Sequence, residues 1–126
     1  MTKILVVEDD PDIRELLIDS LCDIGYAVME AGDGGAGLQS ALEGLPDIIL
    51  LDMMMPVLDG LEVLDRLKSN PLTRFIPVIM VSAKGQEQDI STALNSGALS
   101  YLVKPWEPED LEAKVRQAEA AIRETA

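Results

Sequence analysis

The sequence predicts a doubly wound α/β fold, in which helices cover both faces of a five-stranded parallel sheet. Five short apolar runs, at residues 3–7, 26–30, 47–51, 77–82 and 100–103, alternate with segments whose apolar residues recur at three- or four-residue spacing. The first, third and fourth runs are apolar at successive residues, which is typical of strands buried on both faces. Strands that alternate with helices need right-handed crossovers, and the strand order 2-1-3-4-5 is the leading candidate.

The first predicted strand, 3–7, leads into a helix with clear start and stop signals. Asp10 can cap this helix, Pro11 suits its first position, and Gly25 can end it. Helical spacing joins Ile13, Leu16, Leu17, Leu21 and Ile24. The lone cysteine, Cys22, follows Leu21 and is expected to be a small apolar filler.

The later elements follow the same alternation. After strand 26–30, Asp33 can cap a helix from about Gly34 to Glu43, which Gly44 would close. After strands 47–51 and 77–82, the predicted helices carry two sets of apolar residues: Leu61, Leu64 and Leu67 in one, and Ile90, Ala93 and Leu94, ending near Gly97, in the other. After strand 100–103, the last helix has Pro108 in its first turn and carries Leu111, Val115, Ala118 and Ile122.

Length and composition limit the classes of function. The 126 residues suit one domain, predicted to span 1–126. A net charge of −13 argues against a nucleic-acid-binding surface and against docking on anionic membranes. No signal peptide or membrane-spanning run is recognised, so a cytoplasmic location is expected. The sequence has no histidine, which excludes Ser-His and Cys-His nucleophiles.

Polar residues follow four of the five predicted strands. Glu8 and Asp9 follow the first, Asp52 the third, and Lys104 the fifth, whereas Ser82 ends the fourth. Because the carboxyl ends of parallel strands meet at one edge of a sheet, we expect these side chains to lie together. Two carboxylates about 4–5 Å apart would repel by roughly 3–4 kcal/mol. Proton uptake by one carboxyl, neutralisation by Lys104, or a hard divalent cation such as Mg²⁺ could each offset this repulsion.

A cation beside Asp52 would leave a carboxylate able to accept a phosphoryl group. Aspartate is a competent nucleophile toward phosphorus, and phosphoryl transfer needs in-line positioning and neutralised equatorial oxygens. Lys104 and the Ser82 hydroxyl could hold two of those oxygens, and a metal ion the third. No base is needed, because the carboxylate is already ionised.

Four motifs that occur in order along the whole chain resemble those of a known protein family: "ILVVEDD", "LLDMMMP", "VIMVSA" and "YLVKPW". The chain resembles the receiver domain of two-component response regulators, as in the chemotaxis receiver, which has a flavodoxin-like (βα)5 fold. Ser82 lies thirty residues after Asp52 and Lys104 fifty-two after it, spacings similar to those of the family.

The resemblance implies a role for each of these residues. Asp52 would be the phosphorylated aspartate, assisted by Ser82 and Lys104. Magnesium, or manganese in its place, would be bound by Glu8, Asp9, Asp52 and the backbone carbonyl of Met54. Tyr101 would be the aromatic switch that follows Ser82, and the Lys104–Pro105 bond would be cis.

The implied function is a phosphorylation-dependent switch, not an enzyme. A histidine kinase or histidine phosphotransfer protein would supply the phosphoryl group, and the surface of the fourth helix, fifth strand and fifth helix would then be remodelled. That surface would bind a downstream protein or control an output domain. We expect the fourth helix to rearrange easily, because Ile90 and Leu94 are its only large apolar residues.

Three other functions fit parts of the pattern. A flavin-binding protein of the same architecture is disfavoured, because "EDDPD" would repel a cofactor phosphate where a phosphate-binding loop is needed. A haloacid-dehalogenase-type phosphatase usually carries a second Asp where Met54 stands. The third alternative is a receiver-like scaffold that binds proteins without being phosphorylated.

Overall fold

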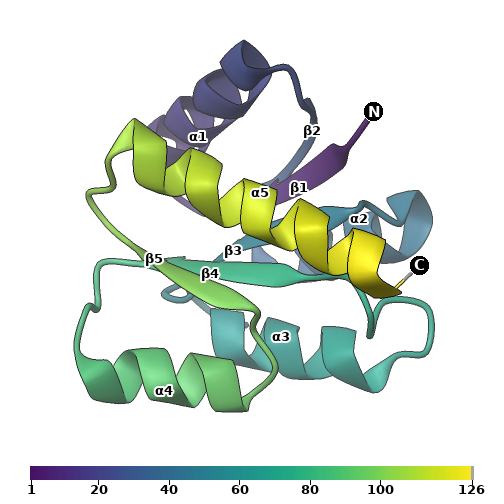
Figure 1. The fold of residues 1–126 in the computed structure, drawn as a ribbon. Helices are drawn as coiled ribbons and strands as arrows, with labels where there is room; N and C mark the ends of the chain where they lie inside the picture. The colour runs from purple at the N-terminus through teal and green to yellow at the C-terminus, as the bar shows by residue number, and fades with distance from the viewer. Residues whose placement is uncertain (126) are drawn as a thin grey trace.

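The computed structural model describes residues 1–125, and within them five parallel strands form one sheet in the order β2-β1-β3-β4-β5 (Figure 1). This confirms the predicted fold class and strand order. The strands are β1 (Lys3–Val7), β2 (Ala27–Ala31), β3 (Ile48–Asp52), β4 (Val78–Ser82) and β5 (Ser100–Val103). The helices are α1 (Pro11–Ile24), α2 (Gly34–Gly44), α3 (Gly60–Ser69), α4 (Glu87–Asn95) and α5 (Pro108–Thr125).

Alternate residues of each central strand enter opposite cores. On one face, Ile4, Val6 and Leu50 join a cluster that contains Leu17 of α1 and Leu111 of α5. On the other face, side chains such as Leu5 and Leu51 pack with residues of α2, α3 and α4. Figure 1 shows α1 and α5 on one side of the sheet and α3 and α4 on the other. Strands β3 and β4 are buried along their whole length, as their uninterrupted apolar runs predict.

The predicted caps Asp10, Asp33 and Gly25 are confirmed. The Asp10 side chain accepts hydrogen bonds from the backbone amides of Asp12 and Ile13, and Asp33 accepts one from Ala36. Gly25 has a φ of 111°, the left-handed conformation that ends α1. One boundary differs: α2 includes Gly44, and Leu45 takes the left-handed cap at φ 41°.

Three apolar side chains lie outside the cores in which the sequence placed them. Leu16 and Leu94 are 57% and 42% exposed, and the side chain of Cys22 is also exposed. In α1 the fully buried residues are Leu17 and Leu21, with Ile13 and Ile18 packed partly buried beside them, whereas Leu16 and Cys22 face solvent. In α4 the small Ala93 is the residue that becomes fully buried against the sheet. No helix within residues 1–125 combines the length and the apolar character needed to cross a bilayer.

Gly60 determines how closely α3 approaches the end of β3. A β-carbon at this position would lie 2.6 Å from the α-carbon of Met53 and would also clash with the Asp52 carbonyl. We therefore expect Gly60→Ala to destabilise the protein by about 1–3 kcal/mol in urea unfolding. Gly35→Ala is the matched control, because its β-carbon meets nothing closer than the Asp33 carboxyl oxygen at 3.4 Å. A similar loss in both variants would contradict this account.

Candidate functional site

The strand register brings the predicted acids together at the carboxyl edge of the sheet. Val7 of β1 pairs with Leu51 of β3, so the next residues, Glu8 and Asp52, lie beside one another. One carboxylate oxygen each from Glu8, Asp9 and Asp52 lies within 4.8 Å of the others. Glu8 and Asp52 are buried, whereas Asp9 is exposed. We refer to these three residues as the acid cluster.

Lys104 reaches the acid cluster from the end of β5. Its ammonium Nζ lies 2.7 Å from Glu8 Oε1 and 3.4 Å from Asp52 Oδ1. Its peptide bond to Pro105 is cis, as the resemblance implied. The lysine therefore bridges the two buried carboxylates, and its shorter contact is with Glu8.

The electrostatics of the metal-free cluster oppose ionisation of Asp52, contrary to the expectation from the sequence that this carboxylate is already ionised. Burial, and then the neighbouring Glu8 carboxylate, raises the pKa of Asp52 from 3.8 to about 8. Burial alone would lower the pKa of Lys104, but its contacts with Glu8 and Asp52 outweigh that effect and raise it. Three ionised carboxylates and one ammonium would leave two negative charges uncompensated.

The donor atoms of the acid cluster fit a hard divalent cation. All three side chains offer carboxylate oxygens, which suit Mg²⁺, and a charge of two would balance the excess. Asp9 faces solvent, so water molecules could complete the coordination. Asp52 Oδ1 also accepts a hydrogen bond of 3.2 Å from the backbone amide of Met54.

Ser82 and Tyr101 are linked through one loop residue. Ser82 Oγ accepts a hydrogen bond of 3.1 Å from the Lys84 amide, and the Lys84 carbonyl accepts one of 2.7 Å from the Tyr101 hydroxyl. Both side chains are buried, and the Tyr101 hydroxyl also contacts the Met53 sulfur at 3.3 Å. No sequence pattern points to Lys84, because its backbone atoms make these contacts.

The structure places the other predicted residue, Met54, at the rim of the site. Its side chain is 54% exposed, whereas its neighbours Met53 and Met55 are buried as core residues. A pocket lined by all three methionines and by Lys84 adjoins this rim. The side chain of Met54 is thus free of the core, and its backbone holds the Asp52 carboxylate.

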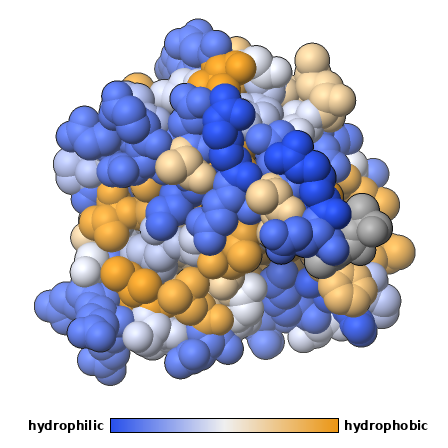
Figure 2. Space-filling view, viewed as in Figure 1, coloured by the Kyte–Doolittle hydropathy of each residue, from blue (hydrophilic) through white to orange (hydrophobic). Residues whose placement is uncertain are grey.

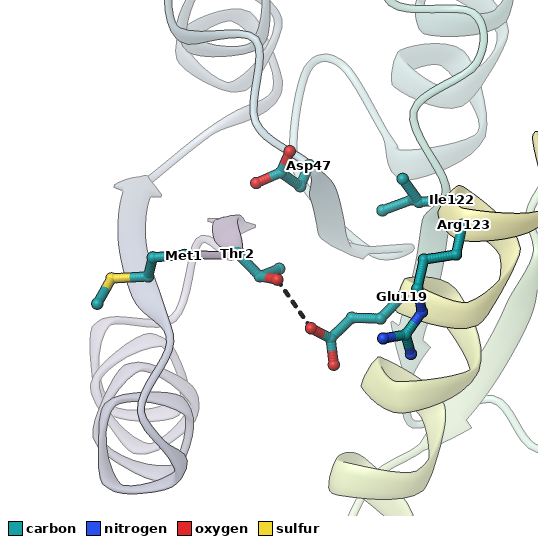
Figure 3. A pocket seen from close by; sticks show the side chains of 6 residues that line it. All are labelled: Met1, Thr2, Asp47, Glu119, Ile122 and Arg123. Carbon is teal, nitrogen blue, oxygen red and sulfur yellow. Dashed lines mark hydrogen bonds between the residues drawn. The ribbon is translucent and has the colours of Figure 1, made fainter. Parts of the chain in front are cut away.

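A separate pocket of about 300 Å³ lies at the opposite, amino end of the sheet (Figure 3). Thr2, Asp47, Glu119 and Arg123 are among the residues that line it. Its central carboxylate is already engaged, because Glu119 accepts hydrogen bonds from Thr2 at 2.8 Å and from the Tyr26 hydroxyl at 2.6 Å. This pocket shares no residue with the acid cluster.

The sheet order places the chain in the flavodoxin-like class of α/β proteins, and its acidic site lies at the carboxyl ends of the neighbouring strands β1 and β3. The chain belongs to the response regulator receiver domain family, whose model matches residues 4–116. Among solved structures, it is similar to the chemotaxis protein CheY4 of Vibrio cholerae, with 31% identity and a TM-score of 0.88 over 94% of this chain and 98% of that one. A CheY-like receiver domain protein from Methanospirillum hungatei gives 29% identity and a TM-score of 0.89, with 98% of each chain covered.

The curated relatives are about twice as long. The chain is 42% identical to the DNA-binding dual master transcriptional regulator RpaA of Synechocystis, over 99% of this chain and 51% of that protein. It is 40% identical to the phosphate regulon transcriptional regulatory protein PhoB of Escherichia coli, over 90% of this chain and 50% of that protein. The chain thus spans about half the length of the curated relatives that it matches.

Proposed function

We propose that the chain is a phosphorylation-dependent switch in which Asp52 accepts the phosphoryl group. The supporting observation is the acid cluster itself, where a buried aspartate lies beside Lys104 and two further carboxylates. Exposure to acetyl phosphate and Mg²⁺, followed by intact-mass measurement of the wild type and of Asp52→Asn, tests this function.

The proposed chemistry is a single displacement at phosphorus. An oxygen of Asp52 forms the new bond to phosphorus, and the bond from phosphorus to the donor breaks, with its electron pair leaving on the donor. Lys104 would stabilise negative charge on one phosphoryl oxygen, and the Ser82 hydroxyl would donate a hydrogen bond to a second phosphoryl oxygen. Glu8, Asp9, Asp52 and the Met54 carbonyl would hold Mg²⁺, or Mn²⁺ in its place, which neutralises charge on the phosphoryl group when bound.

The proposed partners follow from the family and from this chemistry. A histidine kinase or histidine phosphotransfer protein would donate the phosphoryl group, because the chain has no histidine of its own. The chain would assist its own phosphorylation and dephosphorylation only, so we class it as a signalling domain and not as an enzyme. The transcriptional relatives suggest an output domain or a separate downstream protein as the target, and we place the exchange in the cytoplasm.

The link from Ser82 to Tyr101 offers a route from Asp52 to the surface of α4, β5 and α5. If Ser82 turns its hydroxyl toward a phosphoryl group, the Lys84 amide loses its acceptor and the loop that Tyr101 holds must shift. Helix α4 can rearrange at little cost in free energy, because its only fully buried residue is the small Ala93 and the Gln86 side chain does not cap its amino end. Figure 2 shows apolar side chains gathered over β5 between α4 and α5. Leu94 of α4 and Val103 of β5 are both partly exposed.

We expect Tyr101→Phe to weaken the transmission of the signal. The variant keeps the ring but loses the hydrogen bond to the Lys84 carbonyl, which contributes about 1 kcal/mol. Amide exchange measured with and without beryllofluoride should change less in residues 84–95 of this variant than in the wild type.

Tyr26→Phe is the matched control for this experiment. It also removes a tyrosine hydrogen bond, to Glu119 at the far end of the sheet, and should leave the response of α4 unchanged. Identical exchange of α4 in the wild type with and without beryllofluoride would contradict the proposed route, as would an equal loss of response in both variants.

A further inference from the structure

We propose that Arg14 is a positioning residue for cation binding, because it holds the peptide group that joins Glu8 to Asp9. The inference rests on the proposed function, in which these two acids bind Mg²⁺. It assigns a role to a side chain of α1 that lies outside the acid cluster and outside the four family motifs.

The guanidinium group of Arg14 connects three segments of the chain. Its Nη1 donates a hydrogen bond of 2.8 Å to the backbone carbonyl of Glu8. Its Nε donates to Glu30 Oε1 on β2 at 3.2 Å. A β-carbon at Gly32 would lie 3.3 Å from Nη1, so the group fits closely over the backbone that follows β2. The Arg14 side chain is 21% exposed.

The carbonyl that Arg14 holds belongs to the peptide group between the two acids. Glu8 points into the protein and Asp9 points out, so the orientation of this peptide group decides where both carboxylates lie. The Glu8 amide still donates to the Ala31 carbonyl of β2 at 3.1 Å, which extends the strand pairing by one residue. Arg14 then fixes the carbonyl side of the same residue, at the point where the chain leaves the sheet.

The ion pair with Glu30 alone does not explain this arrangement. The side chain of Glu30 is 60% exposed, and ion pairs between exposed side chains contribute little to stability. The shorter bond is the one to the Glu8 carbonyl. Residues that orient metal ligands through hydrogen bonds commonly change metal affinity by about 10–100-fold when they are replaced.

Simple electrostatics and positioning predict opposite effects of removing Arg14. A positive charge near a cation site repels the cation, so its loss alone would strengthen Mg²⁺ binding. If Arg14 positions the acids, Arg14→Gln should instead weaken Mg²⁺ binding, by about 10-fold. Arg14→Lys keeps the charge but cannot reproduce the two bonds of the guanidinium, so we expect it to weaken binding as well.

The experiment measures the Mg²⁺ dissociation constant of each full-chain variant by calorimetric titration, after circular dichroism has verified folding. Glu30→Gln is the control, because its amide oxygen can still accept from Arg14, and its affinity should match that of the wild type. A second readout needs no metal: amide exchange at Asp9 and Asp10 in the metal-free protein should be faster in both Arg14 variants than in the wild type.

The outcomes separate the inference from the function on which it rests. Equal or tighter Mg²⁺ binding by Arg14→Gln, or an unchanged affinity in Arg14→Lys, would overturn the positioning role while leaving phosphorylation of Asp52 intact. Absence of Mg²⁺ binding and of phosphorylation in the wild type would instead reject the proposed function, and the inference with it.

Discussion

Wild-type protein treated with acetyl phosphate and Mg²⁺ is expected to gain the mass of one phosphoryl group, and Asp52→Asn is expected to gain none. The Asn side chain keeps nearly the same shape but lacks the carboxylate nucleophile, so phosphorylation should be lost completely. Replacing a neighbouring residue of the site would only change the rate of phosphorylation. Mn²⁺ should support the same reaction, and excess EDTA should stop it, because the excess negative charge of the acid cluster would repel an anionic donor.

Asp65→Asn is the matched control for this measurement. Asp65 is an exposed acid of α3, so its replacement changes the net charge by the same amount without touching the cluster. Peptide mapping should place the modification between Ile48 and Asp59, the segment that contains Asp52. Modification of Asp52→Asn at wild-type rate would rule out Asp52 as the acceptor.

The sheet was predictable because burial of a parallel strand leaves a strong mark on the sequence. Runs such as Ile48–Leu51 favour a strand that is buried on both faces. Helix caps such as Asp10 and Asp33 act through local hydrogen bonds, which sequence spacing indicates. The grouping of Glu8 and Asp52 followed from strand order alone, and the register of β1 and β3 confirms it.

Contacts that depend on the backbone or on the exact helix face were not predictable in this way. Helical spacing indicates an apolar stripe but not its edges, so it predicts burial for Leu16 and Leu94, whose side chains are exposed in the structure. The partners of Arg14 and Tyr101 are the carbonyl oxygens of Glu8 and Lys84, which every residue type offers. Such partners appear only once the chain has been folded in space.

The charge of Asp52 should make the metal-free protein less stable as pH rises. The folded state raises the pKa of Asp52 from 3.8 to about 8, so folded protein holds this proton more tightly than unfolded protein does. The resulting stability is fully present below pH 3.8 and is lost as pH rises to about 8. Asp52→Asn carries no such charge, so in EDTA at pH about 8 we expect it to be more stable than wild type. Solvent partly screens the Asp52 carboxylate, so we expect a difference on the order of 3 kcal/mol, less than the full pKa shift would give.

Magnesium should offset most of this difference in stability, because a cation that binds the ionised cluster stabilises the folded wild type. At a concentration of about 100 times the dissociation constant, this stabilisation amounts to about 2.7 kcal/mol. Asp52→Asn has lost one carboxylate of the cluster and should gain much less, whereas Asp65→Asn should follow the wild type both with and without metal. Urea unfolding of the three proteins across this pH range, in EDTA and in Mg²⁺, measures both effects. If the unfolding free energies of wild type and Asp52→Asn in EDTA changed with pH in parallel, ionisation of Asp52 would not be what destabilises the folded protein.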